Sequence, residues 1–385
     1  MNKKLLIFNI AQGPNTVDLS PESNSWYLKN YESYFDEVQH LTLMGQNKEA
    51  VINGNSGYYF KGSGNTIRDI LLSPFRLYKY VKTYKPDFII TYDQLWTWWT
   101  IVFIRLFTKT RTYLVPMTFP EQMYKVTGKA LSGRLPIWIE RILLGLTYRS
   151  CFKVITSFNL GNYINWMKQN KIIGKKLIIV NSLPESVIFP KFMKRVLEIM
   201  RVDKSNINPA GDKKLIYVGR LHAEKMTDHL VRAMVQIKGK VPGAKLMIVG
   251  QGPDKENLKA LATELNVADV IEFKEYVANA ELPDLLFSAD IFVSPSTGHA
   301  FREASICGLP IVAYDIDWIQ GFLTHKENFY GISNIDYNAF AEGIIALCLD
   351  DELKNHIKKH IKNFAFTYWS PENVKESLET IFSKN

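Results

Sequence analysis

Cysteine is scarce in this 385-residue sequence, which contains only three. Cys151, Cys307 and Cys348 match no metal-ligand spacing, and a small, odd number of cysteines is typical of a protein that stays in a reducing cytoplasm. No secretion signal is predicted, because the basic start of the chain is followed only by the short apolar run Leu5–Ile10. Internal repeats and low-complexity segments are also lacking. These absences favour a globular cytoplasmic protein.

Several cofactor motifs are present only in part. Gly250-Gln251-Gly252 follows an apolar run, but a dinucleotide fingerprint needs a third glycine where Lys255 stands. Gly128-Lys129 lacks the Ser or Thr that follows it in a P-loop, and the glycine five residues before it. His356 and His360 lie one helical turn apart in a lysine-rich run with no third ligand evident, so we expect a solvated helix face and no metal ion. The sequence therefore disfavours an NAD dehydrogenase, a P-loop enzyme and a built-in zinc site.

The excess of positive charge lies entirely in the first half of the chain. Residues 1–190 contain 23 lysines and arginines against 12 acidic residues, whereas the remaining residues contain 24 against 26, from totals of 47 and 38. Such a surface is either simply solvated or attracted to anionic lipid or a lipid diphosphate. The basic residues accompany tryptophans on apolar stripes, and no recognition module is visible, so nucleic acid is not an expected partner.

Two tryptophan-containing apolar segments lie in this basic half. Leu95–Phe107 is too short to span a bilayer, and we interpret it as an ordinary buried helix. Met123–Arg149 combines Trp138 and basic residues with an apolar stripe, a composition typical of interfacial helices. We therefore expect this second segment to contact an anionic membrane surface. Its basic residues are Lys125, Lys129, Arg134, Arg141 and Arg149.

Strand-like and helix-like patterns alternate along the chain, which predicts an α/β protein with a parallel sheet in each half. The length suits two domains, and the polar, turn-rich segment Asn206–Asp212 is the best linker candidate. The expected strands are Lys4–Ile10, Glu37–Leu43, Phe88–Thr91, Arg111–Val115, Lys153–Thr156, Lys176–Val180, Leu215–Val218, Lys245–Val249, Val270–Phe273, Ile291–Ser294 and Pro310–Tyr314. The expected helices are Ser23–Phe35, Ile67–Tyr84 with a kink or restart at Pro74, Leu95–Phe107, Thr227–Lys238, Lys255–Leu265, Ala280–Ser288, Arg302–Cys307, Tyr337–Leu347 and Pro371–Ser383.

Charged side chains follow two of the predicted strands in the second half. The strand Leu215–Val218 runs into a glycine, after which come Arg220 and Lys225. Because open α/β sheets bind ligands at the carboxyl edge of their strands, two cations there suit a diphosphate. Glu303 opens the predicted helix Arg302–Cys307, whose free amides offer a second anion site. Its carboxylate is placed either to accept hydrogen bonds from sugar hydroxyls or merely to cap the helix.

In these two motifs the sequence resembles the retaining, nucleotide-sugar-dependent glycosyltransferases of the GT-B fold. The family concerned is the large family 4-like group, also called glycosyl transferases group 1, which includes many bacterial cell-surface polysaccharide enzymes. Asn181–Pro190 resembles its interdomain N-G-V-D-x-x-x-F-x-P segment. Ile248–Pro253 resembles its strand and Gly-rich turn, and Ala289–Ser296 its A-D-x-F-x-x-P-S strand. Together with the first two motifs, these segments occur in the order found in the family.

The resemblance implies two Rossmann-like domains with parallel sheets that face each other across a cleft. Residues 1–190 would form an acceptor and membrane-facing domain, and residues 206–365 would form the nucleotide-sugar donor domain. Residues 366–385 would include a helix that crosses back to the first domain. The resemblance also implies a metal-independent enzyme without a cofactor, whose donor is a nucleoside diphosphate-sugar such as a UDP-sugar, with UDP and GDP both left open.

The family pattern also implies roles for particular residues. Arg220 and Lys225 would hold the diphosphate and stabilise the charge that develops as the sugar leaves. Glu303 would bind the ribose hydroxyls, and the base would lie against two glycines and the turn at Tyr276-Val277. The residues expected around the donor are Gly219, Arg220, Lys225, Gly250, Gly252, Tyr276, Val277, His299, Ala300, Phe301 and Glu303.

The sequence departs from the family pattern near the reacting sugar. The family usually has two glutamates eight residues apart, but Pro295 stands at the first of these positions, in a loop about four residues shorter than usual. His299 lies near where that glutamate would project. It is expected either to hydrogen-bond a sugar hydroxyl or phosphate, or to have no role.

The acceptor side departs from the pattern as well. Many relatives have a His-Gly pair where Thr118-Phe119 stands. Asp93 would orient the acceptor hydroxyl or cap the next helix, and Glu121 is a parallel candidate. The loop Gln12–Asn24, which contains Gly13, is expected to face the donor and the acceptor.

The first functional hypothesis is a cytoplasmic glycosyltransferase, peripheral on the inner face of the cytoplasmic membrane. It would transfer sugar with retention to a saccharide or lipid-linked saccharide in cell-surface polysaccharide synthesis. One alternative is a soluble GT-B enzyme that acts on a small molecule or protein, or a nucleotide-sugar epimerase of the same fold. The other alternative is an inactive relative that serves as a scaffold.

Overall fold

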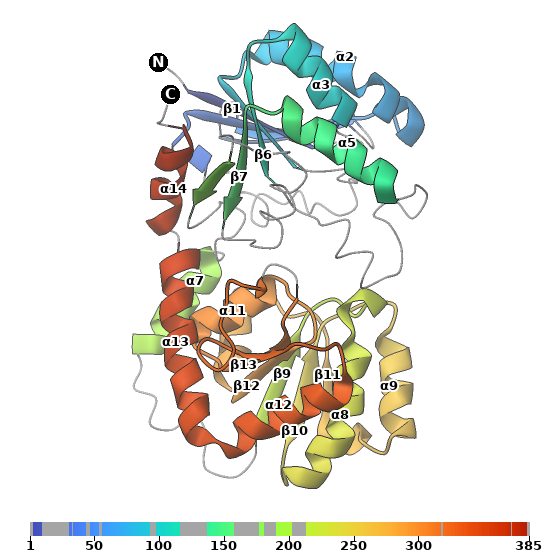
Figure 1. Cartoon of the computed structure of the whole chain (residues 1–385), viewed down its shortest axis with the longest axis vertical. Helices are drawn as coiled ribbons and strands as arrows, with labels where there is room; N and C mark the ends of the chain where they lie inside the picture. The colour runs from blue at the N-terminus through green and yellow to red at the C-terminus, as the bar shows by residue number, and fades with distance from the viewer. Residues whose placement is uncertain are drawn as a thin grey trace. The chain divides into compact units, whose positions relative to one another are not determined.

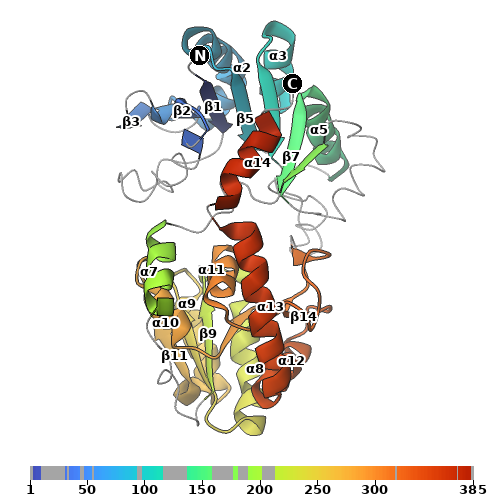
Figure 2. The same cartoon turned by 90° about the vertical axis from the view of Figure 1, so that its left-hand side faces the viewer.

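The computed structural model describes residues 3–9, 31–32, 34–43, 47–53, 56–92, 98–115, 137–157, 177–180, 190–201, 213–316, 319–370 and 372–382. The chain divides into two compact units, each with its own sheet (Figures 1 and 2). Unit 1 comprises residues 1–185 and 372–385, and unit 2 comprises residues 186–371. In the described residues, no helix is both long enough and apolar enough to cross a membrane.

Unit 1 contains an eight-stranded sheet of order β3-β4-β2-β1-β5-β6-β7-β8, in which only the β3–β4 pair is antiparallel. The central strands are buried apolar runs, and Leu5 to Phe8 are fully buried, as expected for a sheet covered on both faces. The strands are β1 (Lys4–Asn9), β2 (Glu37–Thr42), β3 (Asn47–Asn53), β4 (Ser56–Lys61), β5 (Phe88–Tyr92), β6 (Arg111–Val115), β7 (Lys153–Ser157) and β8 (Leu177–Val180). The described helices are α2 (Thr66–Tyr84), α3 (Trp98–Phe107), α5 (Ile137–Ser150) and α14 (Glu372–Phe382).

The last helix of the chain, α14, contributes to the aromatic core of unit 1. The ring of Phe382 lies 4.9 Å from that of Phe35, 5.0 Å from that of Phe88 and 5.1 Å from that of Tyr113, measured between centroids. Phe382 is itself buried. Unit 1 is therefore completed by residues more than 180 positions away from the rest of it in the sequence.

Unit 2 contains a six-stranded, wholly parallel sheet of order β11-β10-β9-β12-β13-β14. This order reverses direction between β9 and β12, which is the topological switch point of a Rossmann-type sheet. The strands are β9 (Lys214–Val218), β10 (Lys245–Val249), β11 (Ile271–Lys274), β12 (Ile291–Ser294), β13 (Ile311–Tyr314) and β14 (Tyr330–Ile332). The helices are α7 (Pro190–Arg201), α8 (Thr227–Lys240), α9 (Lys255–Glu264), α10 (Leu282–Phe287), α11 (His299–Cys307), α12 (Tyr337–Leu349) and α13 (Asp351–Trp369).

The structure differs from the sequence-based prediction in several elements. The β3–β4 hairpin, the edge strand β14 and the helix α7 were not predicted, and of α13 only the stretch around His356 and His360 was expected to be helical. Helix α2 runs through Pro74 as one continuous helix. The expected break before residue 366 falls inside α13, and the chain passes from unit 2 to unit 1 after Pro371.

Candidate functional site

A cavity of about 640 Å³ lies in unit 2, where β9, β10 and β12 end and α11 begins. This is the carboxyl edge of the sheet at its switch point, the usual ligand site of a Rossmann-type sheet. Of the residues predicted to surround a donor, all except Gly252 line this cavity. They are Gly219, Arg220, Lys225, Gly250, Tyr276, Val277, His299, Ala300, Phe301 and Glu303.

Two glycines allow the loops after β9 and β10 to touch through their backbones. A Cβ atom on Gly250, whose φ is 151°, would lie 1.9 Å from the carbonyl oxygen of Gly219. A Cβ atom on Gly252 would lie 2.1 Å from the carbonyl oxygen of Leu221. The Leu221 amide donates to the Gln251 carbonyl at 2.9 Å, so the contact continues the strand pairing into the loops. Gly252 therefore belongs to the loop contact beside the cavity but does not line the cavity itself.

The two predicted cations differ in their surroundings. Arg220 is exposed, and its guanidinium lies 3.2 Å from the carboxylate of Glu224. Lys225 is half-buried, lies in the cavity wall at the end of a short 3₁₀ turn, and has no ion-pair partner among the described residues. An incoming diphosphate would compete with Glu224 for Arg220 but meet no such competitor at Lys225. Lys225 is thus the more readily available of the two to an anion in the cavity.

Helix α11 begins at His299, three residues earlier than predicted. Its N-cap is Gly298, which provides no side-chain cap, so the first backbone amides of the helix point towards the cavity end of the unit. The predicted anion site at the amides around Arg302 was therefore misplaced, and the amides concerned are those of His299 and Ala300. Glu303 lies in the second turn, where it cannot cap the helix start, so the capping alternative is wrong.

Glu303 is a buried acid with one neutral partner. Its side chain is only 4% exposed, and Asn279 Nδ2 donates to its Oε1 at 2.6 Å. Burial raises the pKa of Glu303 to about 7, against the opposing effects of Asn279 and Arg302. The Oδ1 atom of Asn279 is also buried and has no partner in the described structure. Both residues line the cavity, and the pair has hydrogen-bonding capacity that the described residues do not use.

His299 remains neutral near pH 7. Its side chain reaches solvent at the cavity, but the protein atoms packed around the imidazole remove part of its hydration. This desolvation and the neighbouring Arg302 guanidinium both lower the pKa of the imidazole. A neutral imidazole has one N–H donor and one acceptor nitrogen. It can therefore hydrogen-bond a sugar hydroxyl without adding charge.

The residues predicted to contact the acceptor lie outside the part of the chain that the structure describes. Asp93, Gly13 and Glu121 lie outside the described residues, as do Thr118-Phe119 and the loop Gln12–Asn24. The linker Asn206–Asp212 lies outside them too, and so do Lys125, Lys129 and Arg134.

Two features of unit 2 were missed in the sequence. Asn279 follows β11, and nothing in its local pattern signals a contact with Glu303, which is 24 residues away. Sequence reasoning also missed the carboxylate of Glu327, which lies against the imidazoles of both His356 and His360.

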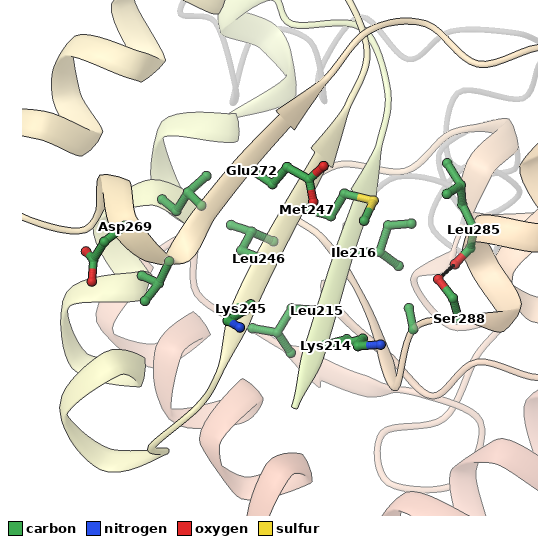
Figure 3. Close-up of a pocket in the computed structure, with 13 residues that line it drawn as sticks. Lys214, Leu215, Ile216, Lys245, Leu246, Met247, Asp269, Glu272, Leu285 and Ser288 are labelled. Atoms are coloured by element: carbon green, nitrogen blue, oxygen red, sulfur yellow. Dashed lines mark hydrogen bonds between the residues drawn. The ribbon is translucent and has the colours of Figure 1, made fainter. Parts of the chain in front are cut away.

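A smaller cavity of about 330 Å³ lies near the opposite, amino ends of the strands of this sheet (Figure 3). Lys214 and Lys245, which begin β9 and β10, lie on it together with residues next to α10. The Ser288 hydroxyl, beside this cavity, already donates a hydrogen bond to the Leu285 carbonyl at 2.8 Å. Because parallel α/β sheets bind ligands at the carboxyl edge, the larger cavity is the candidate site.

Comparison with known proteins agrees with this arrangement. Residues 199–364 match the family model described as glycosyl transferases group 1. The chain is 26% identical over 175 residues to an uncharacterised glycosyltransferase from Methanocaldococcus jannaschii, a match that covers 44% of this chain and 45% of the relative. It is 31% identical over 147 residues to the GDP-mannose-dependent alpha-(1-6)-phosphatidylinositol monomannoside mannosyltransferase of Mycobacterium tuberculosis, covering 35% of this chain and 38% of that protein. The matched segments thus span less than half of either relative.

The whole fold has counterparts among solved structures. A sucrose-phosphate synthase from Thermosynechococcus elongatus aligns with 99% of this chain and 98% of its own, at a TM-score of 0.75 and 14% sequence identity. At that identity the likeness concerns the fold alone, and it confirms the α/β class predicted from the sequence. Residues 199–364 are therefore similar to the glycosyl transferases group 1 family, and the chain as a whole has an α/β fold of the GT-B type.

Proposed function

We propose that this protein is a retaining glycosyltransferase that takes its sugar from a nucleoside diphosphate-sugar. The observation that carries the proposal is one cavity at the switch point of unit 2 that combines two cations, helix amides and a buried acid. In this assignment the ribose hydroxyls lie against Glu303 and Asn279, and the diphosphate lies between Lys225 and the start of α11. The family match and the nucleotide-sugar named for the mycobacterial relative support the donor class.

The chemistry follows from where negative charge develops. When the bond to the sugar breaks, the leaving diphosphate gains charge, and donors already aimed at it lower the barrier. Lys225, Arg220 and the amides of His299 and Ala300 supply that stabilisation, so we propose that transfer needs no metal ion. His299, as a neutral donor, holds a hydroxyl of the sugar.

The direct test is transfer by the purified full-length chain. A thermal-shift screen with UDP and GDP first identifies the nucleotide, because a ligand that binds only the folded state raises the melting temperature. The corresponding nucleotide-sugars are then assayed for hydrolysis and for transfer to saccharide acceptors, with and without EDTA. Release of sugar by the wild type, unaffected by EDTA, supports the proposal. No binding of either nucleotide and no turnover would favour an inactive scaffold.

We further propose that the acceptor is lipid-linked and that unit 1 docks on an anionic membrane. Helix α3 packs against both α2 and α5, and the three lie side by side in unit 1 (Figure 1). Each presents large apolar side chains to solvent, including Phe75 on α2 (57% exposed), Leu106 on α3 (72%) and Trp138 on α5 (59%). The exposed apolar side chains of these helices, here called the apolar face, are Ile67, Leu71, Leu72, Phe75, Leu106, Phe107, Trp138, Ile142 and Leu146.

The exposed apolar residues of α2 and α5 are regularly spaced rather than scattered along their helices. Ile67, Leu71 and Phe75 recur every four residues, as do Trp138, Ile142 and Leu146, so each set forms one stripe along its helix. Exposed apolar side chains that gather in stripes on neighbouring helices are typical of interaction surfaces. The interpretation of Leu95–Phe107 as an ordinary buried helix was wrong for its last turn, where the side chains of Leu106 and Phe107 are exposed.

The charge around the apolar face suits anionic lipid. Exposed basic residues lie on or beside the three helices, whereas Asp69, the only acid of α2, is buried and lies 2.7 Å from the guanidinium of Arg76. Basic residues beside an apolar face are the composition of interfacial membrane helices. The exposed basic residues are Arg68, Lys79, Lys82, Arg105, Lys109 and Arg149. The mycobacterial relative is named for a phosphatidylinositol monomannoside, which supports a lipid-linked acceptor here.

Co-sedimentation with vesicles tests the docking surface. Phe75→Ser combined with Leu106→Ser should reduce binding of the full-length chain to vesicles that contain phosphatidylserine, because both side chains would otherwise enter the bilayer interface. Leu349→Ser is a matched control, since Leu349 is 67% exposed on α12 of unit 2. Equal binding by the double variant, the control and the wild type would contradict the proposed surface.

A further inference from the structure

Three metal-ligating side chains from two segments of unit 2 converge on one point. Glu327 Oε2 lies 3.0 Å from His356 Nε2, and Glu327 Oε1 lies 2.9 Å from His360 Nδ1. The two imidazole nitrogens are themselves 2.9 Å apart. The three side chains, here called the Glu-His-His cluster, are half-exposed and do not line the donor cavity.

Both segments hold their side chains on ordered backbone. His356 and His360 are one turn apart on α13, whose neighbouring residues Ile357 and Ile361 are buried. Glu327 lies in a tight turn, where the amides of Glu327 and Asn328 both donate to the Thr324 carbonyl at 3.1 Å. The cluster is therefore preorganised, as a binding site on a rigid scaffold must be.

With an ionised carboxylate, no arrangement of protons satisfies all three contacts of the cluster. Each facing nitrogen then carries at most one proton. If neither nitrogen is protonated, every contact joins two acceptors. If one is protonated, the other nitrogen still faces a carboxylate oxygen as acceptor against acceptor. If both are protonated, two N–H groups face each other. A cation placed between the carboxylate and the two unprotonated nitrogens would instead interact favourably with all three side chains.

We propose that the Glu-His-His cluster binds one divalent transition-metal ion of the Zn²⁺ class. Two imidazoles and one carboxylate form a ligand set that suits Zn²⁺, with water completing the coordination. Tetrahedral bonds of about 2.0 Å place ligand atoms about 3.3 Å apart. The contacts of the cluster, at 2.9–3.0 Å, are only slightly shorter than that separation. The ion would fix the turn that contains Glu327 to α13. It is a structural site, separate from sugar transfer.

Zinc titration of the full-length chain tests this proposal. The protein is freed of metal with a chelator and then titrated with ZnCl₂ by calorimetry near neutral pH. We expect one ion per chain and a melting temperature that rises with zinc concentration. Glu327→Gln, His356→Gln and His360→Gln should each weaken zinc binding by at least about tenfold. Melting in the presence of chelator should be the same for all three variants and the wild type, which separates ligand loss from misfolding.

Two variants serve as controls. Glu352→Gln removes an exposed carboxylate one turn before His356 on the same helix, and His222→Gln removes an imidazole outside the cluster. Both should bind zinc as the wild type does. Absence of saturable zinc binding in the wild type overturns the proposal, and so does equal weakening in the controls and the cluster variants.

Discussion

Replacing Glu303 with glutamine should stabilise the ligand-free protein at alkaline pH while weakening its binding of a nucleoside. Glu303 is nearly fully buried, and burial raises its pKa from 4.5 to about 7. An acid with a raised pKa in the folded state favours folding in its protonated form. Its contribution is therefore fully present below pH 4.5 and is lost as the pH rises through about 7. The difference in pKa corresponds to at most about 3 kcal/mol.

The assay is urea unfolding at a series of pH values from 4 to 8. The free energy of unfolding of the wild type should fall relative to that of Glu303→Gln across the window between 4.5 and about 7. Titrations of other groups cancel in this comparison, since both proteins share them. Glu342→Gln, which changes an exposed acid on α12, should track the wild type instead.

Ligand binding should move in the opposite direction. Loss of the carboxylate should weaken nucleoside binding by about 1.5–3 kcal/mol, the range for a hydrogen bond to a charged group. A nucleoside monophosphate should lose as much affinity as the diphosphate, because the ribose is the proposed partner. If Glu303→Gln keeps both the wild-type pH profile and the wild-type nucleoside affinity, the assignment of Glu303 is refuted.

Three further outcomes are expected. Lys225→Ala or Arg220→Ala should lower turnover about a hundredfold with little change in the urea midpoint, because each removes a charge-assisted contact in the transition state. Near-normal rates in either variant would exclude that residue from the diphosphate site. Gly250→Ala should lower the free energy of unfolding in urea by about 2–4 kcal/mol, because a Cβ atom would lie 1.9 Å from the Gly219 carbonyl oxygen on a backbone with φ of 151°. An unchanged urea midpoint would contradict that contact. Binding of the wild type to anionic vesicles should fall as salt rises without vanishing, since only the electrostatic part is screened, and complete release by salt would argue against insertion of the apolar face.

The sheets could be predicted well wherever a strand is buried on both faces. The strands β9, β10 and β12 are short, continuous apolar runs, and their predicted bounds agree with the structure to within one residue. The β3–β4 hairpin was missed because β3 is rich in polar residues and lies at the edge of its sheet, where alternation is weak. The lysine-rich part of α13 around His356 and His360 was expected to be a solvated helix face, but the bounds of the helix were not predicted.

The candidate site was predictable to the extent that it depends on single strands and their loops. Arg220 and Gly250 follow buried strands, and their positions at the carboxyl edge could be inferred from that alone. The start of α11 could not, because Gly298 provides no capping side chain to signal it. Contacts between distant segments, such as Asn279 with Glu303 or Glu327 with His356, leave no local pattern and require the fold itself.

The placement of α14 has a consequence for protein synthesis. Residues 186–371 form one continuous unit, so unit 2 has its complete sequence before the last residues of the chain are made. Unit 1 begins first but cannot bury Phe35, Phe88 and Tyr113 against Phe382 until the C-terminal helix has left the ribosome. The second unit can thus finish folding before the first. A chain that stops just before Glu372 would release a complete unit 2 joined to a unit 1 whose aromatic core remains open to solvent and to chaperones.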